Sequence, residues 1–290
     1  MSTTMSHIVT VEGGLVLMSP LRIGGRSPHA DKGASDANNV MPLYDVFEKY
    51  LVLPGSSLKG VCRAQVERIA RVMGSKVCDP TQTAVSSPRR SCAHKEDLYV
   101  CPACQLFGFS PSREGQQSGA KSVKAKGHKS VILFSDALTV KPDGWRCGIR
   151  SVTPLNHFSQ EVVVPLQEQV VPSGTCFPFS IQLHGPVAWH LRLTAFLLRD
   201  LMRERISVGA ASSRGLGSVR LDLRRLVIET YGVSEDEAVM RDIPNLGTAQ
   251  TTNDLFTRVY EWTDATAIEG VLRHWADNQA PLPESEVKVV

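Results

Sequence analysis

The sequence contains no long apolar run, and no stretch approaches the ~18 consecutive apolar residues that mark a membrane-spanning helix. The first residues, MSTTMSH, are polar and lack the apolar segment of a secretory signal peptide. We therefore expect a soluble, cytoplasmic protein without a membrane partner.

Several common catalytic motifs are also missing. The chain has no HExxH, no GxSxG, no glycine-rich loop ending in GK[ST] and no pair of carboxylates on one helical face. These absences argue against a zinc peptidase, a serine hydrolase and a P-loop nucleotide-binding protein. No internal repeat is visible either, so a solenoid is not expected.

Charge is unevenly distributed, although the formal net charge is only +3. Residues 226–290 contain 4 Lys and Arg but 12 Asp and Glu, whereas residues 1–225 contain 28 and 17. A basic body of this kind favours a polyanionic partner. An ordinary solvated surface explains the same asymmetry equally well, so charge alone leaves both interpretations open.

The order of the predicted elements indicates an α+β protein. Alternating residues predict a strand over His7–Leu17, and the polar stretch 26–39 predicts a long loop. The elements expected after this loop are a strand over 51–53, a helix from Ser56 or Ser57 to about Met73, a strand over 129–140, a hairpin over 150–171, a strand over 175–183, a helix over 186–206, a glycine loop leading into a strand, and a helix over about 254–277. This succession is compatible with a ferredoxin-like core that carries long insertions.

Four cysteines, Cys78, Cys92, Cys101 and Cys104, lie within 27 residues that have little regular pattern. The spacing Cys101-x-x-Cys104 is typical of half of a tetrahedral zinc site, which Cys78 and Cys92 would complete, with His94 as the alternative to Cys92. A structural Zn²⁺ would stabilise a segment that has few apolar residues of its own. The alternatives are unpaired thiols and a redox pair; disulfides are disfavoured in a cytosolic protein. The other three cysteines lie in strand or helix patterns and are expected in or near the core: Cys62, Cys147 and Cys176.

Two glycine-containing segments flank the predicted helices. PGSSLKG, at Pro54–Gly60, turns a strand into a helix whose N-terminal amides lie beside Lys59, which is a common arrangement for binding phosphate. SSRGLG, at residues 212–217, offers small residues and Arg214, although a simple helix-terminating loop fits it equally well. Two such sites on one basic body fit a polynucleotide backbone better than a small metabolite.

Taken together, PGSSLKGVCR, CPACQLFG, ILFSDA and SSRGLG resemble the RAMP (repeat-associated mysterious protein) superfamily. More narrowly, they resemble the backbone subunit (Cas-seven group) of type III CRISPR effector complexes. The resemblance covers roughly residues 7–224 and implies a ferredoxin-like, RRM-related palm whose copies stack along a CRISPR guide RNA (crRNA). It divides the chain into a palm at 1–225, with a zinc-binding insertion at about 76–127 and a thumb hairpin at about 150–171, and an acidic helical extension at 226–290.

The resemblance also implies which residues contact RNA. The guide phosphates would be bound by the first turns of the first helix and by the glycine loop, while the thumb hairpin would insert into the guide–target duplex and stack on its bases. The implied contacts are Gly55, Ser56, Ser57, Lys59 and Arg63 at the first helix, Arg214, Gly215 and Gly217 in the glycine loop, and Phe158 or His157 in the hairpin.

In cleaving members of this group, an aspartate in the long loop before PGSSLKG supports metal-dependent cutting of complementary target RNA. Asp36 is the favoured match here and Asp31 the second, with His29 and Asp45 nearby; the cation would be Mg²⁺ or a similar divalent ion. The family has an apolar residue before this aspartate, where the chain has Ser35.

Three functions follow from the resemblance. The first is a guide-RNA-binding backbone subunit with target-RNA endonuclease activity, the second is a scaffold without chemistry, and the third is a guide-processing ribonuclease. The third is the weakest, because no histidine-based acid–base pair lies beside the glycine loop. Partners would be crRNA, target RNA, further copies of the chain and other subunits of the complex. The acidic extension either packs on its own palm or forms a face for a neighbouring subunit.

Overall fold

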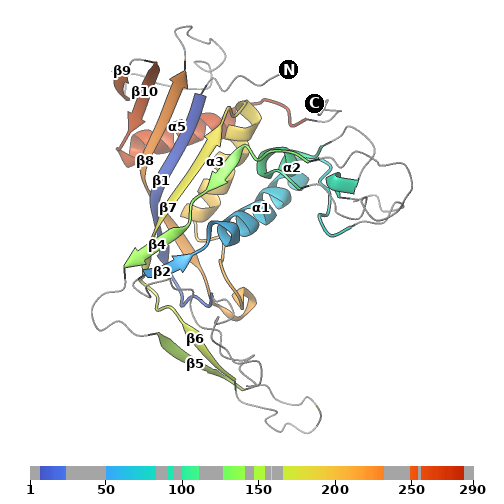
Figure 1. Ribbon diagram of the computed structural model, residues 1–290, viewed down its shortest axis with the longest axis vertical. Helices are drawn as coiled ribbons and strands as arrows, with labels where there is room; N and C mark the ends of the chain where they lie inside the picture. The colour runs from blue at the N-terminus through green and yellow to red at the C-terminus, as the bar shows by residue number, and fades with distance from the viewer. Residues whose placement is uncertain are drawn as a thin grey trace.

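The structure is a computed structural model of the chain (Figure 1), and it describes residues 7–23, 50–82, 91–94, 100–110, 127–140, 147–153, 158, 166–231, 249–253 and 256–283. Its centre is a six-stranded antiparallel sheet with the strand order β3-β7-β1-β8-β10-β9. These strands are β1 (His7–Leu17), β3 (Ile132–Phe134), β7 (Cys176–His184), β8 (Val219–Tyr231), β9 (Gln250–Asn253) and β10 (Thr257–Trp262). No helix within the described ranges is long and apolar enough to cross a membrane.

Four of these strands and two helices form the expected succession β-α-β-β-α-β. Helix α1 (Gly55–Val72) follows β1, and helix α3 (Ala188–Met202) follows β7. The order β3-β7-β1-β8, in which the two strands that follow the helices lie outermost, is the order of a ferredoxin-like core. The predicted α+β class is therefore confirmed.

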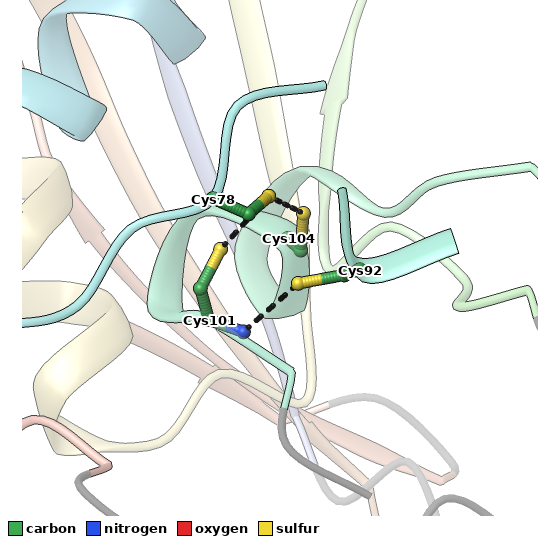
Figure 2. Close-up of side chains that lie close together, drawn as sticks. All are labelled: Cys78, Cys92, Cys101 and Cys104. Atoms are coloured by element: carbon green, nitrogen blue, oxygen red, sulfur yellow. Dashed lines mark hydrogen bonds between the residues drawn. The ribbon is translucent and has the colours of Figure 1, made fainter. Parts of the chain in front are cut away.

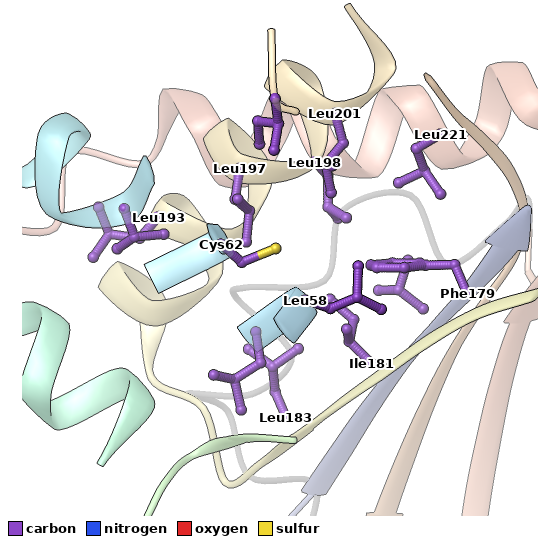
Figure 3. Close-up of a cluster of buried hydrophobic side chains, with 14 of the residues drawn as sticks. Leu58, Cys62, Phe179, Ile181, Leu183, Leu193, Leu197, Leu198, Leu201 and Leu221 are labelled. Carbon is purple, nitrogen blue, oxygen red and sulfur yellow. The ribbon is translucent and has the colours of Figure 1, made fainter. Parts of the chain in front are cut away.

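One face of the sheet is covered by α1, α3 and a third helix, α5 (Ala265–Asp277). Strand β7 shows why: its odd-numbered residues Phe177, Phe179, Ile181 and Leu183 are buried, while most of its even-numbered residues are more exposed. These side chains pack against Leu58 and Cys62 of α1 and a leucine-rich face of α3 (Figure 3). Burial raises the pKa of the Cys62 thiol to about 12, so Cys62 is an inert core residue, as expected.

Two small ribbons accompany the main sheet. Strand β2 (Tyr50–Leu53) pairs with β4 (Ala137–Val140), and β5 (Gly148–Val152) pairs with β6 (Leu166–Val170) as the expected hairpin. The single strand predicted over 129–140 is thus wrong in one respect. Ser135 and Asp136 divide it into β3, which pairs with β7, and β4, which pairs with β2.

The helix predicted over 254–277 is only half correct. Residues Thr257–Trp262 form β10, which pairs with β8 at the edge of the sheet, and the helix begins at Ala265 after the Asp264 side chain caps it. Val259 and Trp262 are three residues apart, which fits a helix, but pairing with β8 determined the conformation instead. β8 itself runs across residue 225, where the sequence suggested a boundary. The palm and extension remain predictions, as do the insertion and thumb boundaries.

Candidate metal centre and the basic surfaces around it

The four cysteines of the predicted zinc site lie together. Cys78 follows α1, Cys92 begins the short 3₁₀ helix η2 (Cys92–His94), and Cys101 and Cys104 stand at the start of helix α2 (Pro102–Phe107). All four Sγ atoms lie within 4.8 Å of one another (Figure 2). Two of the Sγ–Sγ distances are 3.5 Å, between Cys78 and Cys104, and 3.6 Å, between Cys101 and Cys78. We call these four residues the cysteine cluster.

The donor set fits a tetrahedral metal ion. Zinc–sulfur bonds of about 2.3 Å place the corners of a tetrahedron roughly 3.8 Å apart, close to the distances in the cysteine cluster. All four cysteines are buried and none forms a disulfide. Metal binding would require these thiols to lose their protons, because the ligands of zinc are thiolates. The cluster can therefore bind a metal ion such as zinc. The backbone of His94 belongs to η2, and its side chain lies outside the described part of the chain.

A basic residue of α1 reaches the cysteine cluster. Arg63 donates from Nη2 to Cys104 Sγ at 3.0 Å, from Nη1 to the carbonyl oxygen of Gly108 at 2.9 Å and from Nε to Glu67 Oε1 at 3.0 Å. Only 20% of the Arg63 side chain is exposed. The structure thus places this expected RNA contact in an internal network.

The N-terminus of α1 differs from the prediction. The N-cap residue is Pro54 rather than Ser56 or Ser57, and no local side chain accepts a capping hydrogen bond. Instead, the amide of Gly55 donates to Asp136 Oδ1 at 2.7 Å. A Cβ at Gly55 would lie only 2.7 Å from the carbonyl oxygen of Phe134, so this glycine is required for close approach to the β3–β4 link. Asp136 belongs to the ILFSDA motif, but its pairing with Gly55 was not predicted, because the two residues lie 81 positions apart in the chain.

The rest of PGSSLKG lies on the first turns of α1. Ser56 and Gly60 are exposed, while Ser57 and Lys59 are half-buried. Lys59 Nζ donates to Ser130 Oγ at 3.1 Å, and burial, followed by the charge of Arg63, lowers its pKa. The motif therefore offers an exposed serine and the N-terminal end of a helix, with one amide already bound to a carboxylate.

The glycine loop lies at the end of the sheet where β8 begins. Arg214 ends the 3₁₀ helix η4 (Ser212–Arg214), and Gly215 and Gly217 follow with φ values of +82° and +76°. A Cβ at Gly217 would collide with the carbonyl of Val208, whereas a Cβ at Gly215 would meet nothing within 4 Å. Gly217 thus has a packing role, and Gly215 is required only for its left-handed conformation.

The glycine loop and the hairpin meet around one buried carboxylate. Glu168 of β6 is 3% exposed and forms ion pairs with Arg22 at 2.9 Å and, more weakly, with the half-exposed Arg214 at 3.6 Å. Arg150 of β5 donates to the Arg214 carbonyl oxygen at 3.4 Å. The sequence carried no signal for Glu168 or Arg22.

This arrangement also positions the chain that leads towards the candidate catalytic loop. The amide and carbonyl of Leu21 bond to Val171 beside the hairpin, and the Arg22 carbonyl oxygen accepts from Ala210, just before the glycine loop. Leu21 and Arg22 are therefore held between the hairpin and the glycine loop. Asp31, Asp36 and His157 lie outside the described residues; Phe158 is described and is 94% exposed.

A family model described as the RAMP superfamily matches residues 15–220. The chain belongs to the RAMP superfamily. The match includes the five segments described above: the end of β1, helix α1, the cysteine cluster, the hairpin and the glycine loop. A comparison with curated proteins finds no match. As a RAMP, the chain is expected among CRISPR-associated, RNA-binding subunits, which agrees with its basic body.

Proposed function

We propose that this RAMP is a crRNA-binding backbone subunit of a type III CRISPR effector complex and that it cleaves bound complementary RNA. The observation that carries the proposal is the convergence at one end of the sheet. Leu21 and Arg22 are held there by the glycine-loop region and the base of the hairpin, and Asp31 and Asp36 follow them in the sequence. The segment that precedes the candidate aspartates in the sequence is therefore held beside Arg214, a candidate phosphate contact.

Guide binding would use phosphate contacts from more than one element. Arg214 is half exposed, and its weak 3.6 Å contact with Glu168 is easily exchanged for a phosphate, because Arg22 keeps the buried carboxylate paired. Ser56 and the first turn of α1 supply hydroxyl and amide donors. Phe158, which is exposed beyond β5, is the natural side chain to stack on a base.

Cleavage would depend on Asp36, with Asp31 as the second candidate. A divalent cation such as Mg²⁺, held by this carboxylate, would supply charge stabilisation at the scissile phosphate. The chain's own contribution is to fix the target strand so that a 2′-hydroxyl oxygen attacks the adjacent phosphorus in line with the departing 5′ oxygen. The new bond closes a 2′,3′-cyclic phosphate, and the broken bond leaves a 5′-hydroxyl.

The cysteine cluster is proposed to hold a structural zinc ion. The cluster joins the chain after α1, at Cys78, to η2 and α2. These two short helices are the only regular elements described between α1 and β3, so a metal ion would hold this part of the chain together. Cys78, Cys92, Cys101 and Cys104 would be the ligands. Metal analysis of the purified chain should give about one zinc per chain, and Cys101→Ser should reduce this value sharply.

The function is tested with the assembled complex, labelled complementary RNA and Mg²⁺, comparing wild type with Asp36→Ala and Asp31→Ala. Evenly spaced cuts that disappear in Asp36→Ala support the proposal. Cuts that disappear only in Asp31→Ala would move the catalytic role to that residue. Cuts that survive both changes would assign cleavage to another subunit.

A second candidate is a scaffold that binds crRNA and performs no chemistry. The observation that favours it is the structural use of motif residues, since Gly55 and Arg63 both have partners within the chain. Retained target binding without cuts in the wild-type complex would decide for this candidate.

A further inference from the structure

We propose that Arg63 is a positioning residue of the cysteine metal centre rather than a ligand of RNA phosphate. This inference rests on the proposed zinc site and adds to it a residue outside the ligand set. The guanidinium of Arg63 donates to three acceptors in the chain: Cys104 Sγ, the Gly108 carbonyl oxygen and Glu67 Oε1.

The first argument is electrostatic. Four thiolates around a divalent cation carry a net charge of −2, and the cysteine cluster is buried. A guanidinium bonded directly to one of the sulfur atoms offsets part of that charge where water cannot. Glu67 orients the guanidinium through Nε and is itself buried, so the cation is held in one direction.

The second argument is geometric. Arg63 contacts α2 at two points, the side chain of Cys104 within the helix and the carbonyl of Gly108 just after it. Gly108 has φ +71°, and a Cβ there would lie 2.7 Å from both the His128 carbonyl oxygen and the Ser130 amide. The Gly108 carbonyl therefore has little freedom to move. Because Arg63 bonds to both this carbonyl and Cys104 Sγ, it holds the sulfur atom in a fixed position.

The third argument is the direction of the side chain. A phosphate contact needs free donors at the surface, but three of the five N–H groups of the Arg63 guanidinium donate within the chain, and only 20% of its side chain is exposed. Arg68, one turn further along α1, is the opposite case: it is exposed and donates only to Gln65 within the described contacts. The two arginines therefore form a matched pair on one helix.

The test measures metal affinity and RNA binding separately. The full chain is loaded with Co²⁺, whose thiolate charge-transfer absorption reports cysteine coordination, and zinc competition then gives relative affinity. The variants are Arg63→Gln, Arg63→Lys and the control Arg68→Gln. We expect Arg63→Gln to weaken metal binding about 10–100-fold, as loss of an outer-shell partner does, with Arg68→Gln unchanged. Arg63→Lys keeps the charge but loses the fork, and should also weaken binding.

RNA binding supplies the opposing readout. Affinity for a fluorescein-labelled single-stranded RNA is measured against salt concentration with zinc at saturation. The slope should be unchanged in Arg63→Gln, because no phosphate contact is lost. Wild-type metal affinity in both Arg63 variants, with a slope reduced by about 0.7, would overturn the inference and assign Arg63 to a phosphate.

Two further outcomes are separated by design. If the wild-type chain shows no thiolate absorption with Co²⁺, the zinc proposal itself is wrong, and the role of Arg63 is wrong with it. If Arg63→Gln does not fold, Glu67→Gln removes the charge that pairs with Arg63 and, at the longer distance of 3.5 Å, with Arg71. Arg71→Gln loses only the second pair and is the control. A several-fold loss of metal affinity in Glu67→Gln supports the inference, and an unchanged affinity overturns it.

Discussion

The backbone amide of Gly55 donates a 2.7 Å hydrogen bond to the carboxylate of Asp136, which lies 81 residues later in the sequence. A helix N-terminus is usually capped by a residue immediately before it. Here the cap comes from the link between β3 and β4, so it joins α1 to the edge of the main sheet and to the β2–β4 ribbon. The start of PGSSLKG therefore makes a tertiary contact that anchors α1 to the sheet, and the motif is also a candidate phosphate site.

Asp136→Ala should destabilise the chain by about 1 kcal/mol, because the first amide of α1 loses its acceptor and the helix dipole loses a favourable charge. Asp136→Asn keeps an acceptor and should lose less. Urea unfolding measures both. Asp222→Asn, at an exposed pair with Arg220, is the control and should change stability by less than about 0.5 kcal/mol. Equal stability of Asp136→Ala and wild type would contradict this role for the cap.

The two glycines of PGSSLKG should respond oppositely to alanine. Gly55→Ala places a Cβ 2.7 Å from the Phe134 carbonyl oxygen and should destabilise the fold by about 1–3 kcal/mol. Gly60 is an exposed residue within α1, and a Cβ added there would meet nothing within 4 Å, so Gly60→Ala should stabilise the helix by about 0.5–1 kcal/mol. Thermal unfolding of the two variants checks both signs at once, and a stabilising Gly55→Ala would refute the close-approach argument.

Glu168→Gln should loosen the hairpin. The change leaves the part-buried Arg22, whose side chain is 18% exposed, beside a neutral amide, and the cost should stay below the roughly 3–5 kcal/mol of breaking a fully buried ion pair. Hydrogen exchange should accelerate in β5 and β6 before it does in β7. The control is Glu12→Gln, whose exposed pair with Arg225 should contribute less than about 1 kcal/mol. Unchanged exchange in the hairpin would show that Glu168 does not anchor it.

His190 should make stability depend on pH. Burial, followed by the charge of His128, lowers its pKa to about 3, below the ordinary value of 6.5. Between these two values the unfolded chain binds a proton that the folded chain does not, so this contribution to stability falls as pH falls below 6.5, by up to about 1.4 kcal/mol per pH unit. The neutral ring is held by a 3.1 Å hydrogen bond from the Val187 amide to Nδ1.

His190→Asn keeps an acceptor near the Val187 amide and removes the titration. Its free energy of unfolding, measured in urea between pH 4.5 and 7.5, should therefore vary less steeply with pH than that of wild type. Parallel profiles for the two proteins would show that the buried histidine does not contribute to the pH dependence.

The local sequence pattern was sufficient to predict a helix or strand that buries one of its faces. The alternation in β7 and the apolar face of α3 are visible in the residues themselves, because strand and helix periodicity depend on neighbours in the chain. Pattern failed where distant pairing determined the conformation. The run 129–140 reads as one strand, but its halves pair with β7 and β2 in separate sheets. Likewise, Thr257–Trp262 forms a strand because it pairs with the edge of β8.

The sequence by itself identified the cysteines of the candidate metal site, with His94 as the alternative to Cys92, and also the glycine positions and the family motifs, because short spacings and residue chemistry are local properties. Only the tertiary structure decided how those residues are used. Arg63 could point to solvent or to α2 from the same helix position, and the thiol of Cys104, the Gly108 carbonyl and Glu67 together direct it inward. Glu168 and Asp136 acquire partners far along the chain for the same reason: a buried or helix-terminal charge requires a partner of opposite charge or a donor, and folding determines which one is near.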